Sequence, residues 1–192
     1  MFWAWFRKDK EMKLTKPIIL VGMMGSGKTA VGRELAHMLQ VEFIDSDAEI
    51  EKAANMSIPE IFSRDGEAFF RKRETEVLRR IILGESKVMA TGGGAFIGQI
   101  NRKMILSFGV SVWLNADIGV LWERVKNKKS RPLIMTEDPF STLKGLHDER
   151  EQVYKQADIS IEIKFKISVI EAAELVLERL IFKGFLERRK ND

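Results

Sequence analysis

The sequence contains no cysteine and only two histidines among its 192 residues. A chain without cysteine has no disulfide, no zinc–thiolate site and no cysteine nucleophile. The two histidines, His37 and His147, are too few for a histidine-rich metal cluster. The absence of cysteine is typical of a reducing compartment, so we expect a cytoplasmic protein.

Long apolar runs are also missing, since none approaches the roughly 18–20 residues that a transmembrane helix needs. We therefore expect no membrane span. The aromatic start, Met1 to Phe6, precedes a charged stretch, which is the reverse of a signal peptide. We expect residues 1–16 to form a poorly ordered N-terminal extension; the alternative is a weak anchor to an interface or a partner.

The composition is that of a globular domain, with 45% hydrophobic and 31% charged residues. We expect one domain over residues 17–192, and a monomer. The net charge of +4 permits anionic partners but does not require nucleic acid. We therefore expect small-molecule substrates and no nucleic-acid partner.

Short apolar runs alternate with helical patterns along the chain. The runs predict buried strands at 17–21, 41–44, 88–90 and 110–114, and a strict alternation from Ile159 to Ile167 predicts an edge strand. Helices are expected after residue 28, from a capping box at Ser57, after a break at Gly66, after Asp117, over 146–154 and over 168–182. This alternation predicts a parallel sheet with helices on both faces.

A phosphate-binding loop is the strongest motif. Residues 22–29 read Gly-Met-Met-Gly-Ser-Gly-Lys-Thr, between an expected strand and an expected helix. Its glycines allow close approach of backbone amides to phosphate oxygens, Lys28 can reach the β/γ-phosphates, and the Thr29 hydroxyl can ligate Mg²⁺. A GTPase is disfavoured, because the stretch from Asn127 to Ser130 lacks the aspartate of the guanine motif.

Further polar residues follow the expected strands. Asp45 and Asp47 come after the second strand, where one could serve Mg²⁺ and the other a substrate hydroxyl, or both could belong to a solvated turn or helix cap. Gly92, Gly93 and Gly94 follow the third strand and admit close approach of a ligand. Arg71, Arg124, Arg131 and Arg150 suit planar anions, and each could instead be a surface residue.

Taken together, these motifs resemble the shikimate kinase family from about Pro17 to Phe182. The resemblance rests on the phosphate-binding loop, Asp45-Ser46-Asp47, residues 61–67 with Phe70-Arg71, Gly92-Gly93-Gly94, Arg131-Pro132-Leu133, and Arg150 with Tyr154. It implies a three-layer α/β/α P-loop kinase fold with a five-stranded parallel sheet in the order 2-3-1-4-5. It also implies substrate-binding helices at about 46–84 and a lid at about 126–145.

The resemblance further implies ATP-dependent phosphorylation of the shikimate 3-hydroxyl, with Mg²⁺. Lys28, Asp47 and Arg131 would then be catalytic, and Thr29 and Asp45, the latter through water, would hold the metal. ATP would contact Gly25, Ser26, Gly27, Lys28, Thr29, Ala30, Arg124 and Arg131. Shikimate would contact Asp47, Arg71, Gly92, Gly93, Gly94 and Arg150.

Two other functions remain open from the sequence. One is a related small-molecule kinase, such as a gluconate kinase, which would hold an open-chain sugar acid. The other is a non-catalytic nucleotide-binding module with a polyanion or membrane partner, supported by the net charge of +4 and the aromatic N-terminus. The family pattern also has an arginine over the adenine after the last strand, where this chain has Lys164-Phe165-Lys166.

Overall fold

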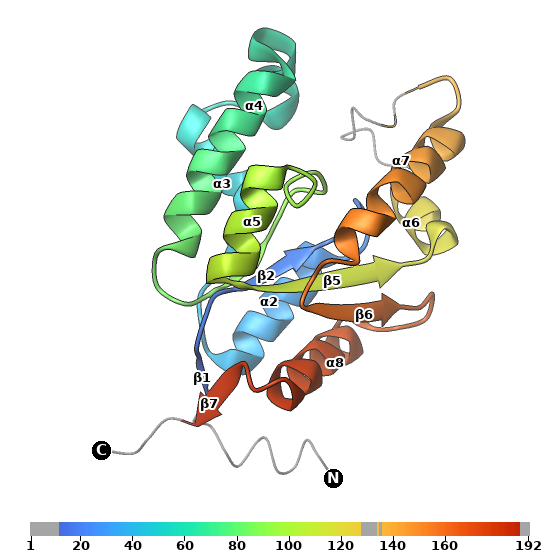
Figure 1. Cartoon of the computed structure of the whole chain (residues 1–192). Coiled ribbons are helices and arrows are strands. Elements are labelled where there is room, and N and C mark those ends of the chain that lie inside the picture. The colour runs from blue at the N-terminus through green and yellow to red at the C-terminus, as the bar shows by residue number, and fades with distance from the viewer. Residues whose placement is uncertain (1–11, 128–133, 135, 189–192) are drawn as a thin grey trace.

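A five-stranded parallel sheet forms the centre of the protein (Figure 1). The computed structural model describes residues 12–127, 134 and 136–188. The sheet strands are β2 (Ile18–Val21), β3 (Phe43–Asp45), β4 (Val88–Ala90), β5 (Val110–Ala116) and β6 (Ile159–Ile163). Their spatial order is β3-β4-β2-β5-β6, which confirms the predicted order 2-3-1-4-5.

Burial of the strands follows their sequence patterns. All residues of β2 and β4 are buried, as expected for strands covered on both faces. In the edge strand β6 buried and exposed residues alternate. The prediction that this strand runs on to Ile167 is wrong: it ends at Ile163, and the Ile167 amide donates to the Lys164 carbonyl in a turn. The capping box at Ser168 then begins the next helix, which ends the extended conformation.

Helices cover both faces of the sheet. The helices are α2 (Lys28–Leu39), α3 (Ser46–Ala54), α4 (Ile58–Ile82), α5 (Gln99–Phe108), α6 (Ile118–Val125), α7 (Pro139–Tyr154) and α8 (Val169–Phe182). Helices α2 and α8 pack together on one face, whereas α4, α5 and α7 lie over the other (Figure 1). The three-layer arrangement is therefore the one that the sequence predicts.

Helix α4 begins at the predicted capping box. The Ser57 hydroxyl accepts from the Glu60 amide, and the Glu60 carboxylate accepts from the Ser57 amide. The predicted break at Gly66 is confirmed, because Gly66 has φ 79° and ψ 173°, which are not helical values. Helix α4 thus consists of the two expected helical segments, joined at a kink.

Two helical segments differ from the sequence prediction. Helix α5 is not predicted, although β4 and β5 are parallel strands of one sheet and the chain between them must cross over. Helix α7 begins at Pro139 and not near residue 146, with the Asp138 carboxylate accepting from the Ser141 amide at 3.1 Å. In α7 the only buried residues are Leu143, Arg150 and Tyr154. Apolar residues therefore do not recur often enough at helical spacing to predict the start of this helix from the sequence. The expected lid therefore ends in helix, and residues 128–133 and 135 lie outside the described part of the chain.

A short antiparallel ribbon joins the two ends of the described chain. Strand β1 (Met12–Leu14) pairs with β7 (Leu186–Arg188), and neither strand is predicted by the sequence. Of the expected N-terminal extension, residues 1–11 lie outside the described residues. The ribbon lies away from the carboxyl ends of the sheet strands (Figure 1).

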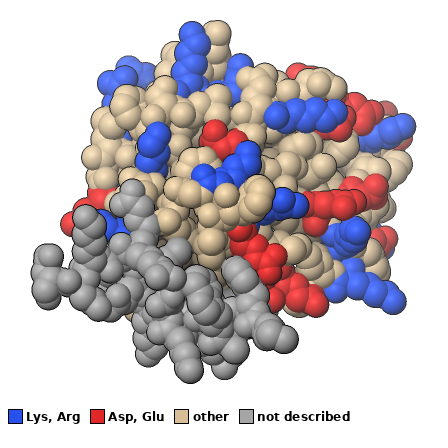
Figure 2. Space-filling model, turned by 60° about the horizontal axis from the view of Figure 1, so that its bottom comes forward, with Lys and Arg blue, Asp and Glu red and all other residues tan. Residues whose placement is uncertain are grey.

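Charges of both signs are interspersed on the face that Figure 2 shows. Where described residues are visible there, Lys and Arg alternate with Asp and Glu among many uncharged side chains. A polyanion-binding surface would instead carry a continuous basic field. Among the described residues, no helix is both long and apolar enough to cross a bilayer.

Candidate active site

The predicted phosphate-binding loop connects β2 to the N-terminus of α2. The buried Lys28 ammonium donates to the Gly22 and Met23 carbonyls, each at 2.9 Å, and so lies across the loop. Gly25 and Gly27 have positive φ, as a tightly curved loop requires. The loop amides and the start of α2 supply positive potential, which makes this a cradle for phosphate groups.

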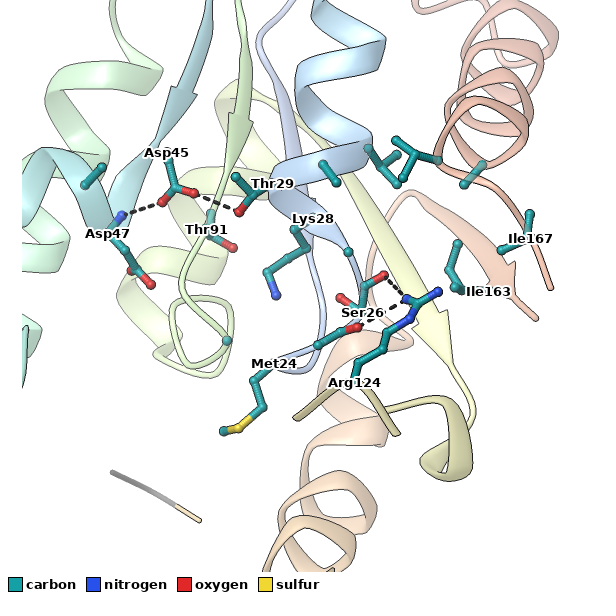
Figure 3. Close-up of a pocket in the computed structure, with 18 of the residues that line it drawn as sticks. Met24, Ser26, Lys28, Thr29, Asp45, Asp47, Thr91, Arg124, Ile163 and Ile167 are labelled. Atoms are coloured by element: carbon teal, nitrogen blue, oxygen red, sulfur yellow. Dashed lines mark hydrogen bonds between the residues drawn. The ribbon is translucent and has the colours of Figure 1, made fainter. Parts of the chain in front are cut away.

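A cavity of about 680 Å³ opens above this loop (Figure 3). It is lined by the predicted nucleotide residues Gly25 to Ala30, together with Asp45, Asp47, Thr91, Arg124, Ile163 and Ile167. Polar side chains lie at one end, where Asp45 faces Thr29. Arg124 and two isoleucines lie at the other end. The cavity therefore has an acidic end and, on the other side of the phosphate cradle, an end formed by one arginine and two isoleucines.

Asp45 connects the acidic end of the cavity to helix α3. One of its carboxylate oxygens accepts from the Thr29 hydroxyl at 2.8 Å, and the other accepts from the Asp47 amide at 3.1 Å (Figure 3). Asp45 is thus the N-cap of α3, as the cap alternative predicted, and it also lies beside the loop threonine. Hydroxyl and carboxylate oxygens in contact are suitable ligands for Mg²⁺ or for its waters.

Arg124 lies at the end of the cavity that also contains the two isoleucines. Its guanidinium donates to the Gly25 and Ser26 carbonyls at 3.2 and 3.4 Å, which holds it beside the loop. Ile163, the last residue of β6, and Ile167 beyond it line the cavity opposite Arg124. This arrangement offers a planar cation and an apolar surface for a flat ring. The predicted catalytic Arg131 lies outside the described residues.

A second cavity of about 460 Å³ adjoins the first. It brings together all of the residues predicted to bind the acceptor, namely Asp47, Arg71, Gly92, Gly93, Gly94 and Arg150. Helices α3 and α4, the glycine loop after β4 and helix α7 each contribute to its wall. Met24, Asp47, Glu51 and Gly93 line both cavities, so the two share a wall.

The two arginines of the second cavity differ in their partners. Arg71 is held by Glu67 at 3.0 Å and Glu74 at 3.1 Å. Gly94 makes room for it, because a Cβ there would lie 2.7 Å from both terminal guanidinium nitrogens. Arg150 is buried, and its Nη1 finds no acceptor among the described residues. A buried donor of this kind is costly unless a ligand satisfies it, which indicates an anion site.

Glu74 also lines the second cavity, although it is not among the site residues predicted from the sequence. Its side chain is 1% exposed, and the Asn101 amide donates to it at 3.4 Å. Burial raises the pKa of the Glu74 carboxyl to about 7, although the adjacent Arg71 guanidinium lowers it. One signal could have identified its burial: Glu74 continues the stripe of Val77, Leu78 and Ile81 at helical spacing.

This burial predicts a pH-dependent stability. Between 4.5, the ordinary pKa of glutamate, and about 7, the folded chain holds a proton on Glu74 that the unfolded chain has released. The Glu74 contribution to the free energy of unfolding therefore falls as pH rises through this window, by on the order of 3 kcal/mol. The free energy of unfolding, measured with urea at several pH values across this window, should fall for the wild type and not for Glu74→Gln. The two plots against pH should therefore diverge by this amount. Parallel curves would contradict the assignment.

Comparison with known proteins gives a consistent result. A family model described as shikimate kinase matches residues 24–180. A shikimate kinase of Ruegeria pomeroyi is 54% identical over 167 residues, covering 87% of this chain and 86% of that protein. One of Cereibacter sphaeroides is 55% identical over 150 residues, covering 78% and 75%.

Solved structures agree in fold. Shikimate kinase from Acinetobacter baumannii in complex with shikimate has a TM-score of 0.85 at 38% identity, covering 88% of this chain and 94% of that one. A gluconokinase from Sinorhizobium meliloti has a TM-score of 0.56 at 17% identity and covers 90% and 99%, which shows a shared fold alone. Since the family match extends over most of the chain and curated relatives exceed half identity, this chain belongs to the shikimate kinase family.

Proposed function

We propose that this protein transfers the terminal phosphoryl group of ATP to the 3-hydroxyl of shikimate, giving shikimate 3-phosphate and ADP. The observation that carries the proposal is the shared wall of the two cavities. A phosphate cradle lies on one side of Asp47 and Gly93, and two arginines lie on the other. A kinase needs this proximity, because the acceptor oxygen must lie in line with the terminal phosphorus.

ATP is assigned to the larger cavity. The amides of residues 25–30 bind the phosphates, and the Lys28 ammonium moves from the loop carbonyls to the β/γ-phosphate oxygens. The adenine lies between Arg124 and the surface of Ile163 and Ile167. Arg131 is proposed as a second cation near the phosphates, on the basis of its sequence motif alone.

Mg²⁺ is assigned to Thr29 and Asp45. Their oxygens are in contact at 2.8 Å beside the phosphate cradle, so the residues fit a cation that takes the threonine hydroxyl directly and the carboxylate through water. Among the described residues, no group of three or more acidic or histidine side chains forms a metal cage. This fits Mg²⁺, which keeps most of its waters and substrate ligands. When bound, the ion neutralises charge on the phosphate oxygens.

Shikimate is assigned to the second cavity. Arg71 and Arg150 grip its carboxylate, and Arg150 gains an acceptor for its buried Nη1. Backbone groups of Gly92, Gly93 and Gly94 line the ring, and Asp47 holds the hydroxyls and receives the proton of the attacking one. Binding energy at the carboxylate end thereby orients the reacting end.

The alternatives are less well supported. A gluconate kinase shares the fold, but the acceptor cavity of this chain carries paired arginines suited to a carboxylate on a compact ring. A non-catalytic module does not account for Asp47 and Lys28 facing one cavity. A monomeric state and a cytoplasmic location stay predictions from the sequence.

ADP release with ATP and Mg²⁺, measured with and without shikimate, tests the function. We expect release to depend on shikimate and not on gluconate. ADP release that ignores shikimate would overturn the proposal.

Arg71→Ala tests the carboxylate clamp. We expect kcat/KM for shikimate to fall by more than about tenfold, or about 1.4 kcal/mol, with ATP binding little changed. Arg73→Ala is the matched control, because Arg73 pairs with Glu76 on the exposed side of the same helix. Since Arg71→Ala leaves Glu74 buried without its ion pair, the double variant Arg71→Ala/Glu74→Gln separates lost binding from lost folding. A collapse of ATP affinity would contradict the assignment of Arg71.

A further inference from the structure

Tyr154 is the only tyrosine of a chain that contains 12 phenylalanines. It is the last residue of α7 and lies one helical turn after Arg150. Its side chain is 1% exposed. Phenylalanine would suffice at a buried position that needs only an aromatic ring. A tyrosine there indicates that its hydroxyl forms a hydrogen bond.

The hydroxyl of Tyr154 donates to the carbonyl oxygen of Gly93. Two aromatic rings stack with the tyrosine ring, with the Phe96 ring centroid at 6.4 Å and the Trp113 centroid at 6.0 Å. Burial raises the pKa of Tyr154 to about 12, so the hydroxyl keeps its proton and remains a donor. A rigid ring therefore delivers one donor to one backbone carbonyl.

Gly93 is the residue at which this contact matters. It lines both cavities, so its peptide forms part of the wall between nucleotide and acceptor. Its Cα also lies close to the phosphate-binding loop, because a Cβ there would be 3.3 Å from the Met24 amide nitrogen. A small shift of Gly93 would change the spacing between the loop and the acceptor cavity.

We propose that Tyr154 is a positioning residue, whose hydroxyl holds the Gly93 carbonyl and so fixes the wall across which the phosphoryl group is transferred. The inference rests on the proposed function, since it concerns the geometry of that reaction. Tyr154 does not line either cavity, and it acts through Gly93. Arg150 and Tyr154 then serve the same pocket from one turn of α7, one by binding the acceptor and the other by holding its wall.

Tyr154→Phe tests the inference, because it removes the hydroxyl and keeps the ring stack. We expect kcat with saturating shikimate to fall by about tenfold or more, since misplacement of the reacting groups is costly. ATP affinity should stay within about twofold of wild type, because the residues assigned to the phosphates are unchanged. Loss of the hydroxyl should also raise KM for shikimate, because the same hydroxyl interacts with Arg150; the decrease in kcat is the readout of the Gly93 contact.

Ser111→Ala is the matched control. The Ser111 hydroxyl is buried in β5, donates to Asp158 at 2.7 Å and lies outside both cavities. It should lower the melting temperature while leaving kcat and KM unchanged. If both variants lose stability alike and Tyr154→Phe keeps wild-type kinetics, the hydroxyl is only structural and the inference is overturned.

A binding measurement keeps the inference testable if Tyr154→Phe does not fold. Since the chain has one tyrosine, isotopically labelled tyrosine reports Tyr154 alone by NMR. Adding shikimate to the wild-type protein should shift this ring resonance, and gluconate should not. An unmoved resonance at saturating shikimate would overturn the inference. If wild type shows no shikimate-dependent ADP release, the proposed function itself fails, which is a separate outcome.

Discussion

Lys28→Met is expected to lower kcat by about 10²- to 10³-fold, or about 2.7–4 kcal/mol of transition-state stabilisation. Methionine keeps most of the length of the side chain and removes the charged terminal group. The ammonium lies against two loop carbonyls at 2.9 Å, in a buried position beside the phosphate cradle to which it is proposed to move. A preorganised cation in such a site contributes most where negative charge develops. Steady-state ADP release at saturating substrates measures the loss.

The control for this variant is Lys87→Met. Lys87 forms an ion pair with Glu42 at 2.8 Å outside both cavities, so the same chemical change there should leave kcat unaltered. Shikimate binding to Lys28→Met, measured by calorimetry, should remain close to wild type because Lys28 does not line the acceptor cavity. A decrease in kcat of less than tenfold would show that other groups carry the phosphate charge.

Asp47→Asn is expected to lower kcat by about 10²-fold or more. Asparagine keeps the shape of the side chain and its ability to bond a hydroxyl, but it cannot accept the proton of the attacking oxygen. Asp47 lines both cavities, and Gly92 allows its approach, since a Cβ there would lie 2.5 Å from a carboxylate oxygen. The single-turnover rate of phosphoryl transfer is the direct measurement.

Asp117→Asn is the matched control for this loss. Asp117 caps α6 by accepting from the Gly119 amide at 2.7 Å and lies outside both cavities. It should change stability slightly and the transfer rate not at all. If Asp47→Asn raises KM for shikimate and leaves kcat intact, Asp47 binds the acceptor without serving as its base.

The strands and the phosphate cradle were predictable because their signals are local. A continuous apolar run marks β2, and the spacing of glycines, Lys28 and Thr29 marks the loop that follows. The sheet order came from the family resemblance, since no local pattern tells which strands are neighbours. Contact between Asp45 and Thr29, separated by 16 positions, follows from the parallel sheet, which brings the ends of β2 and β3 to one edge.

Other features depend on contacts that no local pattern carries. Glu74 resembles a surface ion-pair residue, but the fold buries it and the Asn101 amide of α5 donates to it. The hydroxyl of Tyr154 reaches Gly93 across 61 positions. The sequence predicts a shorter α7 than the structure has, because charged and polar residues cover most of the surface of this helix. In each case tertiary packing assigns a role that residue type alone leaves open.

The ribbon of β1 and β7 has a practical consequence. Met12 lies opposite Arg188 in its register, and the ribbon lies away from the carboxyl ends of the sheet strands (Figure 1). A short peptide could therefore connect these positions in a circular permutant, with new ends opened at another surface turn. A fusion partner attached through either strand would likewise leave both substrate cavities accessible.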